Sequence, residues 1–80
     1  MSENMNPRYE PKTDAQKLGY LIEESGEVLA AAGKSVRWGL DSCNPELPVN
    51  ERESNADWLL REIADLERAI GYVREMLAAR

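Results

Sequence analysis

The stretch TDAQKLGYLIEESGEVLAAAGKSVRWG, residues 13–39, decides the fold of this 80-residue chain. Thr13 lies three residues before Gln16, which is the spacing of a helix capping box. Apolar and small side chains then recur every three or four residues along one stripe, at Leu18, Leu21, Ile22, Ser25, Leu29, Ala32 and Val36. This period indicates an amphipathic helix, and Gly39 is a natural position for its end.

A second stretch, SNADWLLREIADLERAIGYVREML at residues 54–77, has the same period. Ser54 and Asn55 are both good N-caps, and Asp57 follows in the first turn. The apolar stripe of this stretch consists of Leu59, Ile63, Leu66, Ile70, Val73 and Leu77. A second helix of similar length is therefore predicted.

The remaining segments connect or precede these helices. Pro45 and Pro48 disfavour a helix, so residues 40–53 are predicted to form a loop. Residues 1–12 have no apolar period and are predicted to be a flexible N-terminal arm. The fold class is all-α, with residues 13–80 forming one domain of two long antiparallel helices.

Both helices carry apolar residues on more than one side. Beside or opposite the main stripes lie Tyr20, Ala31 and Trp38 on the first helix and Trp58, Ala69, Tyr72 and Met76 on the second. Helices of this kind are usually buried on two sides. We therefore expect a second copy of the hairpin to complete a four-helix bundle, as a homodimer or a dimer of dimers. Simple exposure of the aromatic residues is the alternative.

Composition excludes several classes of protein. The chain has no His and a single Cys, Cys43, which rules out an internal disulfide framework and disfavours a zinc site. A net charge of −5 argues against a nucleic-acid surface. No apolar run approaches the roughly 18 residues of a membrane span, and the first residues lack the apolar core of a signal peptide. The expected location is the cytoplasm, with no membrane partner.

Two groups of carboxylates are the candidate functional residues. Glu23, Glu24 and Glu27 lie close together on the first helix, and Glu62 and Asp65 lie three residues apart on the second. Residues three or four apart share a helix face, so each group can direct a pair of carboxylates the same way. Oxygen ligands of this type suit a hard cation such as Mg²⁺ or Mn²⁺.

A solvated charged face and salt bridges are the alternative interpretations. On the second helix the two acids fall in line with apolar residues, while Arg61, Arg68 and Glu75 mark the polar face. Acids within an apolar stripe need a partner, because an unpaired buried charge is unfavourable. A metal ion would provide one, and so would Arg61 or Lys17.

The string Glu23-Glu24-Ser25-Gly26-Glu27, followed by Glu62-Ile63-Ala64-Asp65, resembles the EExxE…ExxD signature of the MazG-like, all-α nucleotide pyrophosphohydrolases. The chain is similar, over roughly residues 17–70, to a small, phage-type branch of that family. The resemblance rests on both motifs occurring in the right order. The connection between the two motifs is longer than in compact members, and this branch tolerates a longer loop.

The resemblance implies a function and roles for single residues. Glu24, Glu27, Glu62 and Asp65 correspond to metal ligands, and Glu23 corresponds to an additional acid. The implied reaction is the Mg²⁺-dependent hydrolysis of a nucleoside triphosphate to the monophosphate and pyrophosphate, which serves to clean nucleotide pools. Either Glu23 or Glu27 would take the proton of the attacking water.

Other residues near these motifs have two interpretations each. Lys34 and Arg37 follow the acids and are able to attract phosphates, or they simply suit the C-terminal end of the helix dipole. Trp38 and Trp58 flank the loop and either pack in the core or stack on a base. The alternative function is a non-catalytic helical hairpin that oligomerises and binds a partner protein.

Overall fold

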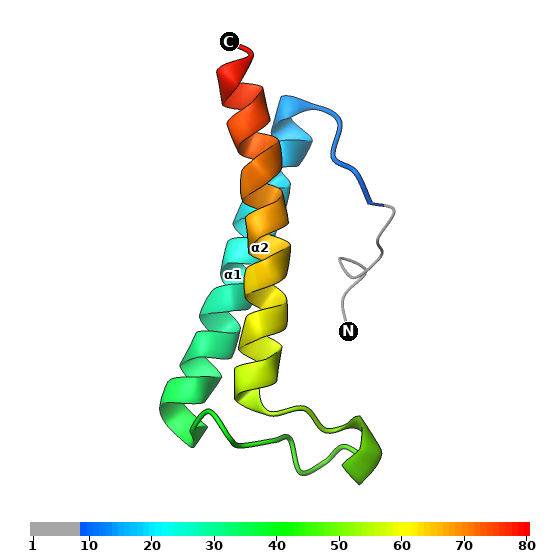
Figure 1. Cartoon of the computed structure of the whole chain (residues 1–80), viewed down its shortest axis with the longest axis vertical. Helices are drawn as coiled ribbons and strands as arrows, with labels where there is room; N and C mark the ends of the chain where they lie inside the picture. Colours follow the sequence, from blue (N-terminus) through cyan, green and yellow to red (C-terminus); the bar gives the residue numbers. More distant parts are fainter. Residues whose placement is uncertain (1–8) are drawn as a thin grey trace.

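The computed structural model describes residues 9–80, which fold into two long helices joined by an extended loop (Figure 1). Helix α1 (Asp14–Trp38) runs the length of the molecule, and α2 (Asn55–Ala78) returns antiparallel beside it. The loop contains one short 3₁₀ turn, η2 (Val49–Glu51). Residues 9–80 contain no strand, so the predicted all-α class is confirmed.

The helix ends form where the local sequence predicts them. Thr13 and Gln16 make the complete capping box: the Gln16 amide donates to Thr13 Oγ1 at 3.0 Å, and the Thr13 amide donates to Gln16 Oε1 at 3.2 Å. Gly39 ends α1 with a φ of 98°, which favours glycine. Ser54 caps α2 by accepting a hydrogen bond from the Asp57 amide. These residues define both ends of α1 and the start of α2.

The sequence predicts that the two helices pair through one apolar stripe each, and the observed contact differs from this on α1. Its buried apolar residues are Tyr20 and Ala31 from α1 and Ala69 and Val73 from α2. Both alanines are fully buried. We name the α1 residues Tyr20, Glu24 and Ala31 the inner face.

The aliphatic stripe that was expected to pair the helices faces solvent instead. We name its four exposed α1 residues the outer stripe: Leu18, Ile22, Leu29 and Val36, which are 44%, 72%, 72% and 89% exposed. The prediction was wrong for these four residues of α1, because large aliphatic side chains were assumed to face the neighbouring helix. The other stripe residues of α1, Leu21, Ser25 and Ala32, are half-buried. On α2 it was partly right, since Val73 is buried and Leu59, Leu66 and Ile70 are half-buried.

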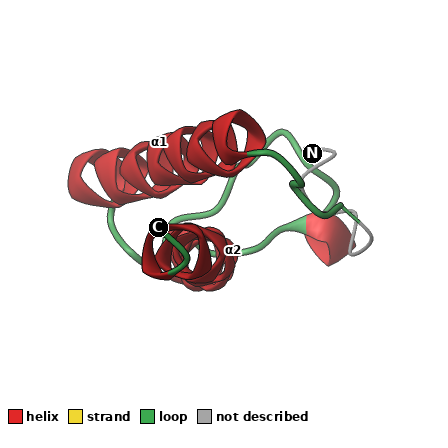
Figure 2. Ribbon diagram, turned by 90° about the horizontal axis from the view of Figure 1, so that it is seen from above, coloured by secondary structure: helices red, strands yellow, loops and turns green. Residues whose placement is uncertain are grey.

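The hairpin is thin. It measures 46 × 24 × 14 Å along its principal axes, and the view from above shows the two helices next to each other with the loop to one side (Figure 2). In such a layer each helix has one helical neighbour. Much of the surface of α1 therefore stays uncovered, including the outer stripe.

The loop is held against the start of α2 by backbone hydrogen bonds. The Asn55 amide donates to the Ser42 carbonyl and the Ala56 amide to the Leu40 carbonyl, both at 2.9 Å. The Asn55 side chain donates to the Gly39 carbonyl at 2.9 Å. The prediction for this loop included no helical turn. The turn η2 begins directly after Pro48, whose backbone nitrogen has no hydrogen to donate.

The described part of the N-terminal arm touches the helices. Tyr9 packs edge-on against Tyr20 with ring centroids 5.1 Å apart, and Pro11 is buried. Residues 1–8 of the predicted arm lie outside the described residues. Within residues 9–80, neither α1 nor α2 has an apolar stretch sufficient to cross a membrane.

Candidate metal centre

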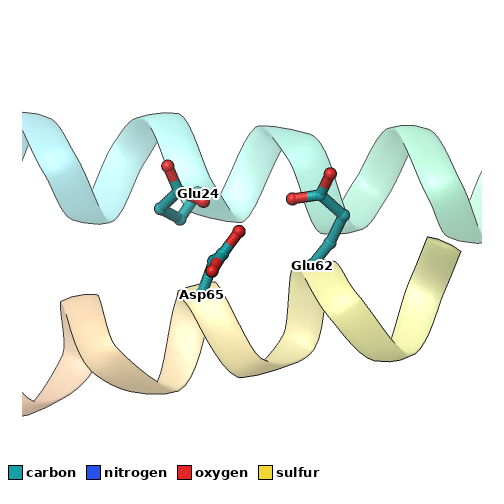
Figure 3. Close-up of side chains that lie close together, drawn as sticks. All are labelled: Glu24, Glu62 and Asp65. Carbon is teal, nitrogen blue, oxygen red and sulfur yellow. The ribbon is translucent and has the colours of Figure 1, made fainter. Parts of the chain in front are cut away.

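Three of the predicted acids meet between the two helices. Glu24 from α1 and Glu62 and Asp65 from α2 each have a carboxylate oxygen within 4.8 Å of the others (Figure 3). Glu62 and Asp65 are three residues apart and therefore lie on the same side of α2. In the structure this side faces Glu24 of α1. We refer to these three residues as the acid cluster. Three converging carboxylates are the ligand type that Mg²⁺ and Mn²⁺ prefer.

Glu24 is the most isolated member of the acid cluster. Its residue is 0% exposed, and neither Oε1 nor Oε2 has a hydrogen-bond partner among the described residues. Asp65 Oδ2 is likewise buried without a hydrogen bond in this part of the chain. A buried polar group without a partner is unfavourable by about 1–3 kcal/mol, and more when it is charged. The geometry therefore fits a cation that completes the coordination of these oxygens.

The environment of Glu24 disfavours its ionised form. Burial raises the pKa of the Glu24 carboxyl to about 7, and the negative charges of Asp65, Glu27, Glu23 and Glu62 act in the same direction. Burial also raises the pKa of Glu62. A cation bound among these carboxylates would reverse both effects, because it stabilises the charged forms.

Glu62 has two partners on its own helix. The Trp58 indole N–H donates to Glu62 Oε2 at 3.0 Å, and Arg61 Nη1 lies 3.4 Å from the same oxygen. Arg61 also pairs with Glu53 of the loop at 2.6 Å. Trp58 and Arg61 both contact the same carboxylate oxygen of Glu62, Oε2.

Asp65 is linked to the inner face through Arg68. Arg68 Nη2 lies 3.7 Å from Asp65 Oδ1, and Arg68 Nε donates to the Tyr20 hydroxyl at 3.0 Å. The sequence analysis placed Arg61 and Arg68 on the polar face and named Arg61 as a possible partner of the acids. Arg61 does contact Glu62, and Arg68 contacts Asp65, because long arginine side chains reach the acids from neighbouring positions on α2. The salt-bridge alternative thus applies to Glu62 and Asp65, whereas no ion pair to Glu24 appears among the described residues.

The other predicted site residues surround the acid cluster without joining it. Glu27 is half-buried, and its charge raises the pKa of both Glu24 and Glu62. Glu23 is exposed beside Glu24. Lys34 lies with its Nζ 5.9 Å from the centre of the Trp58 ring. Arg37 is exposed in the last turn of α1.

Two contacts of the site were not predicted. The Trp58–Glu62 hydrogen bond follows an i, i+4 spacing, so a search for polar pairs on one helix face would have found it. The Tyr20–Arg68 hydrogen bond joins residues 48 positions apart on different helices. No local sequence pattern predicts that contact.

Comparison with known proteins adds no relative: no protein-family model, no curated protein and no solved structure matches this chain.

Proposed function

We propose that this protein is a metal-dependent nucleoside triphosphate pyrophosphohydrolase that uses Mg²⁺ or Mn²⁺. The observation that carries the proposal is the fully buried Glu24, whose two oxygens lack a hydrogen-bond partner in residues 9–80 and lie next to Glu62 and Asp65. The resemblance to the EExxE…ExxD signature supplies the reaction. The bond between the α-phosphorus and the oxygen leading to the β-phosphorus breaks, which gives a monophosphate and pyrophosphate.

The residues of the chain have distinct roles in this reaction. Glu24, Glu62 and Asp65 would hold the metal ion, which, when bound, supplies charge neutralisation at the phosphates and a more acidic water. The attacking water bonds through its oxygen to the α-phosphorus, and Glu27 or Glu23 accepts its proton. Lys34 attracts the phosphate chain, and Arg37 contributes at longer range. A protein that hydrolyses nucleoside triphosphates would act on the cytoplasmic nucleotide pool.

A substrate panel tests the reaction. Canonical ribo- and deoxyribonucleoside triphosphates are incubated with Mg²⁺ or Mn²⁺, and released pyrophosphate is measured. We expect release from at least one of them. Absence of pyrophosphate across the panel with both metals contradicts the proposal.

A matched pair of variants tests the metal centre. Glu24→Gln keeps the side-chain shape and removes the charge, so we expect lost pyrophosphate release and lost stabilisation by Mg²⁺ in thermal melts. Glu67→Gln makes the same change at an exposed position of α2 and is expected to behave like the parent protein. Equal Mg²⁺ stabilisation of the parent and Glu24→Gln would locate metal binding elsewhere.

We infer in addition that two copies of the hairpin associate through the outer stripe. Large aliphatic residues gathered on one side of a helix, here up to 89% exposed in the single chain, are typical of a surface that a partner covers. A thin hairpin of this size also has little core of its own. A second hairpin laid on this side would form a four-helix bundle. Light scattering is expected to give at least a dimer, and a folded monomer of 9.0 kDa would contradict it.

The outer stripe also supports a second candidate function, a non-catalytic hairpin that oligomerises and binds a partner protein. Such a protein does not need the acid cluster to bind metal. Mg²⁺ would then leave its melting temperature unchanged, and no nucleotide would be hydrolysed. The panel and the melts together distinguish the two functions.

A further inference from the structure

Arg68 connects the acid cluster to a tyrosine of the opposite helix. Its Nη2 lies 3.7 Å from Asp65 Oδ1, and its Nε donates a hydrogen bond to the Tyr20 hydroxyl at 3.0 Å. The guanidinium group is planar and rigid, so its donors keep a constant angle to each other. One arginine therefore links a hydroxyl on α1 to a carboxylate of the acid cluster on α2.

The Tyr20 hydroxyl belongs to a ring that is held in place by packing. The residue is 2% exposed, and its ring lies beside those of Tyr9 and Tyr72, with centroids 5.1 Å and 6.1 Å away. Close packing of this kind keeps a side chain in one rotamer. An arginine that donates a hydrogen bond to this hydroxyl is therefore held in one orientation as well.

The contact with Tyr20 decides where the guanidinium of Arg68 lies. The Arg68 side chain is 40% exposed, and an ion pair at the surface of a helix is weak, because water competes for both charges. Attraction to Asp65 alone would therefore leave Arg68 largely free to turn toward solvent. A hydrogen bond from a charged donor to a buried hydroxyl is stronger, and it holds the guanidinium beside Asp65.

The two carboxylate oxygens of Asp65 have different surroundings. Oδ1 lies beside the Arg68 guanidinium, whereas Oδ2 is buried and has no hydrogen-bond partner within residues 9–80. A carboxylate that is held at one oxygen rotates less, so its other oxygen keeps a constant direction. Residues that orient a metal ligand in this way raise the affinity for the metal, because the ligand is in position before the ion binds.

We propose that Tyr20 and Arg68 are positioning residues of the metal centre: Tyr20 holds Arg68, and Arg68 holds Asp65 so that Oδ2 remains available for the cation. The assignment rests on the proposed function for the presence of the metal ion. Both residues act through the orientation of Asp65 and need no contact with the ion or the substrate. Neither belongs to the two acid motifs, and their hydrogen bond joins the two helices.

Two variants that preserve the net charge of the chain test this role. Tyr20→Phe removes one hydroxyl and keeps the ring, and Arg68→Lys keeps the positive charge but loses the planar fork of donors. Titration calorimetry of the full chain with Mn²⁺ alone measures the metal affinity. We expect each variant to bind Mn²⁺ about tenfold more weakly than the parent. If Arg68 only repelled the metal ion, its release in Tyr20→Phe would tighten the binding instead.

Tyr72→Phe is the matched control. Its ring lies beside that of Tyr20, but the hydrogen bond from Arg68 goes to Tyr20. We expect this variant to bind Mn²⁺ as the parent does, and an equal loss in Tyr72→Phe would contradict the positioning role. Circular dichroism at the temperature of the titration verifies that each variant is folded, so that a change in affinity is not a change in folding.

A double variant tests whether the two residues act as one unit. Tyr20→Phe combined with Arg68→Lys should bind Mn²⁺ no more weakly than either single variant, because both changes break the same link to Asp65. Losses that multiply in the double variant would mean that the two residues act separately, which contradicts the proposal.

The positioning role and the proposed function fail in different ways. Unchanged or tighter Mn²⁺ binding in Tyr20→Phe overturns the role of Tyr20 and Arg68 and leaves the metal centre intact. A parent protein that binds no Mn²⁺ overturns both. Weaker Mn²⁺ binding in the two single variants, without pyrophosphate release from any triphosphate by the parent, would retain the positioning role and reject the pyrophosphohydrolase.

Discussion

The inner face and the outer stripe of α1 contrast in composition and in surroundings. The inner face packs against α2 and yet includes a fully buried carboxylate, Glu24. The outer stripe consists of large aliphatic residues and faces solvent. The aliphatic side of α1 is therefore not the side that packs against α2. In a two-helix layer, one side of each helix can hold charged groups together while another remains available for a second copy.

The largest expected effect concerns the outer stripe. Leu29→Lys places a charge where the proposed second copy packs, and both copies carry the change in a symmetric interface. Burying one Leu contributes about 1.5–3 kcal/mol, so the association should weaken by about 3–6 kcal/mol. Analytical ultracentrifugation measures the loss as dissociation to monomers.

Ala30→Lys is the control for this change. Ala30 is exposed, neighbours Leu29 in sequence and lies outside the outer stripe. We expect it to leave the assembly intact. Dissociation of both variants to the same extent would mean that added charge, rather than the loss of apolar contact, separates the copies.

The next effect concerns pH and the inner face. Glu24 has a pKa of about 7 in the folded protein against an ordinary value of 4.5. Between pH 4.5 and pH 7 the folded state binds more protons than the unfolded state. The stability that protonated Glu24 contributes is therefore fully present below about pH 4.5 and is lost as the pH rises through 7. Glu62 acts in the same direction. The Glu24 difference corresponds to roughly 3 kcal/mol.

Urea unfolding of the metal-free protein between pH 5 and pH 8 measures this loss. Glu24→Gln should flatten the curve and be the more stable protein at pH 8. Saturating Mg²⁺ should oppose the loss, because metal binding competes with protons for the carboxylates. Stability that rises from pH 5 to pH 8 in the metal-free parent would show that Glu24 is stabilised in its charged form.

A smaller effect is expected at Arg68, which links the two helices. Arg68→Met removes the hydrogen bond to Tyr20 and the positive charge near Asp65 while retaining an apolar stem. We expect a loss of about 1–3 kcal/mol in metal-free stability, because the buried hydroxyl and the carboxylate lose a partner. Part of it should return with Mg²⁺, which replaces the missing charge.

Arg74→Met serves as the comparison, since Arg74 is an exposed arginine on the same helix. Its unfolding curve should match that of the parent. Similar losses in both variants would assign the effect to the general charge balance of α2 rather than to the contact with Tyr20.

The smallest effect is expected at the edge of the inner face. Tyr9→Ala removes the edge-on contact with Tyr20, and an aromatic pair contributes about 0.5–1.5 kcal/mol. Because Tyr9 is partly exposed, we expect a value near the lower end. Tyr9→Phe keeps the ring and should have the stability of the parent in the same thermal melt. A loss in Tyr9→Phe as large as in Tyr9→Ala would assign the contribution to the hydroxyl.

The sequence predicted those parts of the candidate site that depend on neighbours along the chain. The spacing of Glu62 and Asp65 was sufficient to put both on one side of a helix, and both belong to the acid cluster. Glu24 was identified with them. Glu27 was assigned to the same group by its spacing from Glu24 and by the resemblance, and the cluster of three does not include it. The rotation of α1 about its own axis decides whether Glu24 or Glu27, three positions apart, points toward α2.

By itself the sequence determined where the helices begin and end, because each cap depends on residues within about four positions, as Thr13 with Gln16 does. Only the tertiary structure decided which sides of the helices meet. That choice depends on how each helix is rotated about its axis, which is set by many small packing contributions between the helices, including those of the fully buried Ala31 and Ala69. The same rotation buries Glu24 and turns Leu29 outward. It also decides that arginine side chains reach Glu62 and Asp65 but leave Glu24 without an ion pair among the described residues.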